Sequence, residues 1–179
     1  MSRFDERAEA SAERRGGAGP SRGEIRRVRR ALSTGHRQLE NDLSSIDVLL
    51  NLQVSSNTSV ESGPPPVGSH NNQEAVRFMG RVADDIRRIR TAVTAVDFDA
   101  DDKQKFRLAL KEIANAWDLR AKALGTSDVS RAGALLTQVK EAERRSNVAK
   151  RGLQRYLPKP DFEQEEEERE RREEEAENA

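Results

Sequence analysis

Cysteine is absent from the 179 residues, and histidine occurs only twice. Without cysteine the chain cannot form a disulfide, a thiolate zinc site or a cysteine nucleophile. The two histidines, His36 and His70, lie too far apart in sequence for the helical histidine pair that commonly binds zinc. Phosphate-binding glycine strings and the Gly-x-Ser-x-Gly motif of hydrolases are missing too. We therefore expect no enzyme activity, metal site, cofactor or small-molecule substrate, although carboxylates from distant positions can still converge.

Long apolar segments are lacking as well, because no stretch approaches the roughly 20 apolar residues that span a bilayer. The first 30 residues carry charges without the apolar centre of a secretory signal. Acidic residues interrupt the arginines there, which is untypical of a mitochondrial presequence. We expect a cytoplasmic protein that does not insert into a membrane.

Charge is abundant but unevenly placed, although the formal net charge is zero. Residues 161–179 contain 11 acidic and 3 basic residues, which gives this segment a charge of −8. The remainder therefore carries +8, so a moderately basic body precedes an acidic tail. We expect residues 158–179 to form a solvated, partly helical tail. Its Glu-to-Arg pairs four residues apart support a helix, but it has no apolar face with which to dock.

The first ordered element is predicted to be a long helix over 22–54. Residues 1–20 are polar, end in a Gly/Pro-rich stretch, and are expected to be a flexible arm. Ser21 and Glu24 then have the spacing of a capping box, which satisfies free amides at a helix start. Apolar residues follow in steps of three, four or seven, which predicts one continuous rod about 45 Å long. Its apolar stripe consists of Ile25, Val28, Leu32, Leu39, Leu43, Ile46 and Leu50.

Three further helices are predicted over 73–96, 102–124 and 128–157, after a Pro/Gly-rich loop at 55–72. The last has a seven-residue pattern typical of coiled coils and stops before Pro158. The third carries Phe106, Leu110, Ile113, Trp117 and Leu124 in register. Amphipathic helices without strand patterns bury their stripes most simply against one another. The sequence therefore predicts an all-α fold, a four-helix antiparallel bundle over 21–157.

The string Asp97-Phe98-Asp99-Ala100-Asp101 resembles the start of a calcium-binding loop, with oxygen ligands at the first, third and fifth positions. The similarity then fails, because Asp102 stands where the tight turn requires glycine and Leu108 where a bidentate glutamate is required. The free backbone amides and the dipole at the start of a helix favour carboxylates at that position. We interpret these aspartates as a helix cap.

Four apolar residues fall outside the predicted stripes: Val48, Leu52, Leu108 and Leu119. Val48 and Leu52 lie at the apolar end of the first helix, and Leu108 and Leu119 share one line of the third helix, opposite its main stripe. Their cover is either internal or another protein chain. Our first hypothesis is a non-enzymatic protein that acts by protein–protein interaction, as a self-associating or adaptor protein, through these residues.

Cations repeat at helical spacing on three of the predicted helices. The residues are Arg26, Arg30 and Arg37, then Arg77, Arg81 and Arg88, then Lys140, Arg144, Arg151 and Arg155. Rows of cations can contact phosphates, which makes sequence-indifferent nucleic-acid binding, modulated by the acidic tail, the alternative hypothesis. No aromatic residues interleave with these arginines to stack on bases, and a solvated helix face produces the same spacing.

Overall fold

The computed structural model describes residues 19–58 and 70–157, and in these ranges the chain is helical without β-strands. The predicted all-α fold is confirmed. The elements are α2 (Arg22–Leu32), α3 (His36–Thr58), α4 (His70–Ala95), α5 (Ala100–Gly125), α6 (Val129–Ala149) and the 3₁₀-helix η1 (Gln154–Tyr156). None of these helices is long and apolar enough to cross a membrane. The predicted tail at 158–179 and all but the last two residues of the predicted arm lie outside the described residues.

The helix predicted over 22–54 is two helices, α2 and α3, so the prediction of one continuous rod is wrong. Between them Gly35 has a φ of 77°, in the left-handed region that residues with a Cβ rarely adopt. The Ser33 amide donates to the Arg29 carbonyl, and the Ser33 hydroxyl donates to the Arg30 carbonyl at 2.7 Å. The end of α2 is therefore satisfied locally, and the described chain holds five α-helices rather than four.

The predicted capping residues occupy the helix starts. In α2 the Ser21 and Glu24 side chains each accept a hydrogen bond from the other residue's amide, which forms the capping box. Asp99 accepts from the Asp101 and Asp102 amides, both at 3.0 Å, at the start of α5. Asp128 caps α6 by accepting from the Arg131 amide at 3.1 Å. The carboxylate of Asp99 thus serves a helix start, as the cap interpretation predicts.

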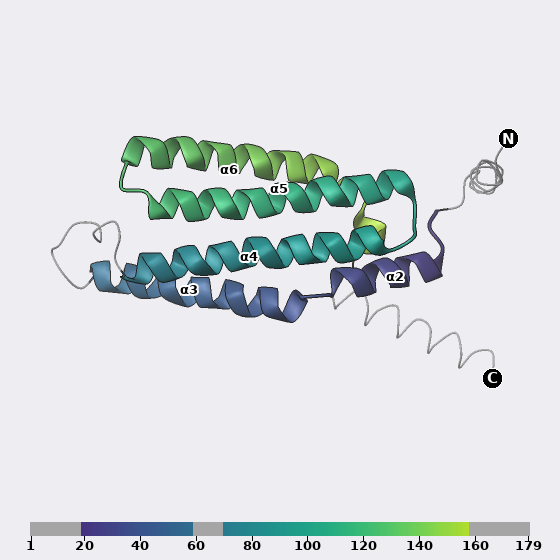
Figure 1. Cartoon of the computed structure of the whole chain (residues 1–179), viewed down its shortest axis with the longest axis horizontal. Coiled ribbons are helices and arrows are strands. Elements are labelled where there is room, and N and C mark those ends of the chain that lie inside the picture. Colours follow the sequence, from purple (N-terminus) through teal and green to yellow (C-terminus); the bar gives the residue numbers. More distant parts are fainter. Residues whose placement is uncertain (1–18, 59–69, 158–179) are drawn as a thin grey trace, which may run out of the picture.

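The helices lie side by side in one row, in the order α6, α5, α4, and then α3 together with α2 (Figure 1). Consecutive helices from α3 to α6 run in opposite directions, whereas α2 and α3 lie end to end along α4 (Figure 1). Each of the long helices packs against its neighbours in sequence. One edge of the row is therefore α6, and the other edge is α2 with α3.

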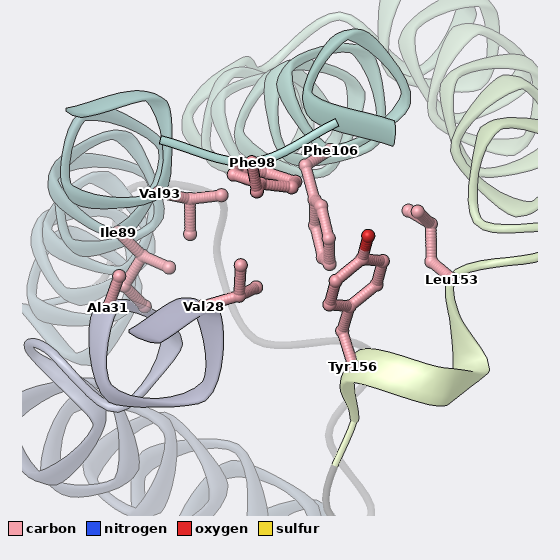
Figure 2. Close-up of a cluster of buried hydrophobic side chains, with 8 residues drawn as sticks. All are labelled: Val28, Ala31, Ile89, Val93, Phe98, Phe106, Leu153 and Tyr156. Carbon is pink, nitrogen blue, oxygen red and sulfur yellow. The ribbon is translucent and has the colours of Figure 1, made fainter. Parts of the chain in front are cut away.

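Three buried clusters hold the row together. The first joins α2, α4 and the start of α5 to the C-terminal residues Leu153 and Tyr156 (Figure 2). The second joins α3, α4 and α5, and the third joins α5 to α6. All seven residues of the predicted first stripe are buried in, or packed against, the first two clusters. The stripe is confirmed even though the helix that carries it is broken.

After α6 the chain turns back, so the helix predicted over 128–157 ends at Ala149. Gly152 has a φ of 80° and permits this reversal. The C-terminal turn, residues 150–157, places Tyr156 edge-on against Phe98 and Phe106, with ring centroids 5.7 and 5.5 Å apart. Arg29 of α2 donates to the Tyr156 carbonyl at 3.0 Å. The turn therefore covers α5 and binds α2 at the same end of the molecule.

Candidate functional site

A groove of about 470 Å³ runs between α5 and α6. Its lining, which defines the α5–α6 groove, is Ile113, Ala116, Trp117 and Arg120 of α5 with Glu143, Ser146, Asn147 and Lys150 near or in α6. Ile113 and Trp117 follow Phe106 by seven and eleven residues, so the three side chains share one line along α5. The C-terminal turn buries Phe106, but Ile113 and Trp117 remain partly exposed.

Further apolar side chains border this line of α5. Leu43 and Leu50 of α3 are partly exposed and pack against the same buried cluster as Trp117. Leu136 of α6 lies seven residues before Glu143, on the same line of its helix, and is 48% exposed. A partly exposed aromatic side chain with partly exposed leucines on neighbouring helices is typical of a protein-binding surface.

Trp117 is held in place by a charged neighbour. The Arg120 guanidinium lies 4.8 Å from the centre of the Trp117 ring and also pairs with Glu143 of α6. The pairing fixes the guanidinium over the indole face, an arrangement in which a cation is attracted by the aromatic ring. The groove thus has an oriented aromatic floor and a rim that carries the further cation Lys150.

A buried pair of carboxyl groups joins α3 to α4. Asp42 and Asp85 are 3% and 2% exposed, and Asp42 lies close enough to raise the pKa of Asp85. Their Oδ1 atoms accept from Gln38 at 3.3 Å and from Arg88 at 3.2 Å, respectively. The Oδ2 atom of each has no hydrogen-bond partner, and a proton shared between the two carboxyl groups would satisfy both.

The pKa of Asp85 is raised above its ordinary value. Burial is the largest cause, followed by the hydrogen bond to Asp42 and the charge of Asp42, while Arg88 opposes them. The exposed carboxylate of Asp84 raises it further. In the described ranges no group of three or more histidine or acidic side chains is placed to hold a metal ion. The two carboxyl groups form a buried contact between α3 and α4.

Asp102 fixes the C-terminal turn to α5. Its carboxylate accepts from the Tyr156 hydroxyl at 2.8 Å, from Lys105 at 3.1 Å and from Arg155. Burial acts to raise the pKa of Asp102, but these hydrogen bonds outweigh it and lower the pKa below its ordinary value. Burial and the bond to Asp102 raise the pKa of Tyr156 to about 12. These groups stabilise the fold, because the buried carboxylate and the buried hydroxyl are hydrogen-bonded to each other.

The four apolar residues predicted as an interface are not brought together. Val48 is 58% exposed on α3, and Leu108 is 42% exposed between α4 and α5. Leu119 is buried beneath α6, where it packs in the third cluster, so its cover is internal. Leu52 belongs to α3, but its side chain lies outside the described residues.

The cations predicted to contact nucleic acid are all exposed, but they lie on separated elements. Arg88, Arg144 and Arg155 form ion pairs with Asp85, Glu141 and Asp102. The predicted row from Lys140 to Arg155 is not one helical line, because α6 ends at Ala149 and Arg155 points back to α5. That part of the alternative hypothesis is corrected. The seven remaining cations lie on α2, α3, α4, α6 and the C-terminal turn: Arg26, Arg30, Arg37, Arg77, Arg81, Lys140 and Arg151.

Comparison of the chain with protein-family models, curated proteins and solved structures gives no match. The geometry of the described residues is therefore the basis for the functional argument. The geometry also identifies two functional candidates, Trp117 and Ile113, that the sequence assigned only to the core. Both residues belong to the predicted stripe of the third helix, and their partial exposure depends on how the helices are arranged.

Proposed function

We propose that the chain is a non-enzymatic protein that binds an amphipathic helix of a partner protein in the α5–α6 groove. The observation that carries the proposal is the line Phe106, Ile113, Trp117 on α5, which the C-terminal turn covers at one end only. Apolar surface that stays exposed beside a formed core favours docking of another apolar surface. The partner's helix would close the open row into a bundle.

The shape and charge of the groove favour a helix with acidic flanks. From Ile113 to Leu124 the exposed line of α5 is about 16 Å long, which matches about three turns of a docked helix. Trp117 with Arg120 supplies the aromatic and cationic anchor that commonly dominates binding energy. Glu143 already pairs with Arg120, so Lys150 is left to meet acidic residues of the partner.

Nucleic-acid binding is supported less well. Three of the ten cations predicted for that role are engaged by carboxylates of the chain itself, so each must give up an ion pair before it contacts a phosphate. The groove with the aromatic anchor combines the apolar side chains of Ile113, Ala116 and Trp117 with the carboxylate of Glu143, which a phosphate backbone does not complement. Protein binding therefore remains the better-supported proposal.

Photo-crosslinking tests the proposed function. A benzophenone amino acid is placed at Asn147, on the groove rim, and at Val48, on an exposed site of α3, in full-length protein in its native cells. We expect one protein adduct from position 147 that is absent from position 48, with the crosslink mapping to an amphipathic helical segment. A synthetic peptide of that segment should bind about tenfold more weakly to Leu136→Asp than to the wild type, as expected for a charge placed in an apolar contact.

The matched control is Val48→Asp, which places the same charge on an exposed valine of α3 and should leave the affinity unchanged. Equal adducts at both positions would show that the groove has no preference for a partner. Adducts with nucleic acid in place of protein would favour the alternative function. A peptide that binds Leu136→Asp as well as it binds the wild type would also contradict the proposal.

A further inference from the structure

A second groove, of about 560 Å³, runs between α4 and α5. Its lining, which defines the α4–α5 groove, is Arg90, Thr91, Thr94 and Ala95 with Gln104, Arg107, Leu108 and Lys111. The line Arg107, Leu108 and Lys111 lies on the opposite side of α5 from Phe106 and Trp117. The two grooves are therefore separate surfaces, and the inference below is independent of the proposed function.

The α4–α5 groove has three cations and no carboxylate in its lining. In the part of the chain that the structure describes, Arg90, Arg107 and Lys111 form no ion pair. The contrast with adjacent positions is sharp, because Arg87 pairs with both Asp84 and Asp118. Unpaired cations gathered around one hollow attract an anionic ligand.

The groove also has an apolar centre. Leu108 is 42% exposed there, and Thr91, Thr94 and Ala95 belong to the same lining. A bare phosphate backbone would leave this apolar surface uncovered, whereas an acidic peptide can cover it with its aliphatic stems and apolar residues. The chemistry of the groove therefore favours an acidic peptide over a nucleic acid.

We propose that the α4–α5 groove binds the acidic segment 161–179 of the same molecule. This segment has a charge of −8 and begins with Asp161, Phe162 and Glu163, so it combines carboxylates with one large apolar side chain. The cations of the groove and the carboxylates of the segment are complementary. Docking would neutralise the groove and shield it from other polyanions.

The position at which the described chain ends makes this contact reachable. Leu157 lies beside α2, because its carbonyl accepts from Arg29 at 2.8 Å. α2 in turn packs against Ile89 and Val93, which belong to the same stretch of α4 as the groove residues Thr91 and Thr94 but face the other side of that helix. The 22 residues after Leu157 reach about 33 Å as a helix and about 70 Å when extended. A tethered segment also has an effective concentration on the order of 1 mM, so weak contacts suffice.

Carbodiimide crosslinking of the full chain tests the proposal, since it joins a lysine amine to a carboxylate in direct contact with it. We expect an amide bond between Lys111 and a glutamate of 161–179 at low salt. Its yield should fall about fivefold in about 0.5 M salt, where charge–charge attraction is screened. The matched control lysine is Lys122, eleven residues further along the same line of α5 and outside the groove, whose yield should be lower by about fivefold.

Two double variants distinguish docking of the acidic segment from random collision. The first combines Arg90→Glu and Arg107→Glu, which reverses the charge of the groove. It should reduce the yield of the Lys111 crosslink about fivefold and leave the circular dichroism spectrum unchanged. Glu165→Lys with Glu166→Lys changes only the acidic segment and should have a similar effect, which keeps the test valid if the first variant is unstable. Equal yields at Lys111 and Lys122, or no response to either variant, would overturn the proposal.

A mixture of isotope-labelled and unlabelled protein identifies the donor of the segment. Crosslinks within one molecule are the expected result, and crosslinks found chiefly between labelled and unlabelled copies would overturn the proposal of an intramolecular contact.

A short DNA duplex tests whether the groove binds nucleic acid instead of the acidic segment. If the duplex protects Lys111 from modification while the acidic segment never crosslinks to it, the groove is a nucleic-acid site and the proposal is wrong.

Discussion

Replacing Tyr156 by alanine is expected to lower the free energy of unfolding by about 3–5 kcal/mol, the usual cost of removing a buried aromatic side chain. Tyr156 is fully buried, packs against Phe98 and Phe106, and donates its hydroxyl proton to Asp102. Its loss removes the ring contacts and one bond to a buried carboxylate together. Since small domains are stable by about 5–15 kcal/mol, this is a large fraction of the total. Urea unfolding followed by circular dichroism measures it.

Tyr156→Phe is the matched control, because it keeps the ring and removes only the hydroxyl. It should cost about 1 kcal/mol, since Asp102 keeps its contacts with Arg155 and Lys105. If Tyr156→Ala also costs only about 1 kcal/mol, the C-terminal turn does not pack on α5 as the structure shows. Comparable losses in both variants would place the energy in the hydrogen bond rather than in the aromatic cluster.

Asp85→Asn is expected to raise the free energy of unfolding near neutral pH by about 1–2 kcal/mol. The amide can donate to Asp42 without a shared proton and can still accept from Arg88. The sign follows from the raised pKa of Asp85 in the folded state. The contribution of its neutral form is complete below the ordinary pKa of 3.8 and is lost as the pH rises through the raised folded value.

Urea unfolding of both proteins from about pH 4 to about pH 8 measures this difference. The advantage of Asp85→Asn should grow with pH and vanish at the acidic end. Asp84→Asn is the control, since Asp84 is the exposed neighbouring carboxylate and pairs with Arg87 at the surface. Its effect should stay below about 0.5 kcal/mol. A destabilising effect of Asp85→Asn near neutral pH would contradict this account, because the carboxyl of Asp85 would then contribute more to stability at that pH than a neutral amide does.

Asp102 provides the opposite pH dependence within the same chain. Because the pKa of Asp102 is lowered in the folded state, its stabilising contribution is present above its ordinary pKa of 3.8 and is lost as the pH falls through the lower folded value. Acid therefore weakens the attachment of the C-terminal turn, whereas a pH above the raised pKa of Asp85 weakens the contact between α3 and α4. We therefore expect the free energy of unfolding to be greatest at a pH between the lowered pKa of Asp102 and the raised pKa of Asp85.

The periodicity of apolar residues predicted the buried faces of the helices correctly, because burial depends on spacing along one helix. Val28 and Ile46 are buried as predicted although they belong to two different helices. The break between those helices had a local signal in Ser33-Thr34-Gly35, which is typical of a helix end. The apolar stripe nevertheless predicts one helix, because a short interruption leaves the apolar faces of both helices directed at the same neighbouring helix.

Contacts between helices could not be predicted from spacing. The Asp42–Asp85 pair joins α3 to α4 across 43 positions, and either residue alone resembles an ordinary surface aspartate. The reversal at Gly152 was missed because Val139, Ser146 and Leu153 are seven residues apart and imitate a continuing helix. The partial exposure of Trp117 depends on where the C-terminal turn ends, which is a property of the packed chain alone.

The central claim, that the α5–α6 groove receives a partner's helix, is tested most directly by acrylamide quenching of Trp117. It is the only tryptophan of the chain, so the emission reports on the groove alone. In the free protein the partly exposed indole should be quenched readily. Saturation with the peptide found by crosslinking should reduce the quenching constant by about half or more and shift the emission to shorter wavelength, since the docked helix excludes water. Unchanged quenching in the presence of a bound peptide would contradict the account.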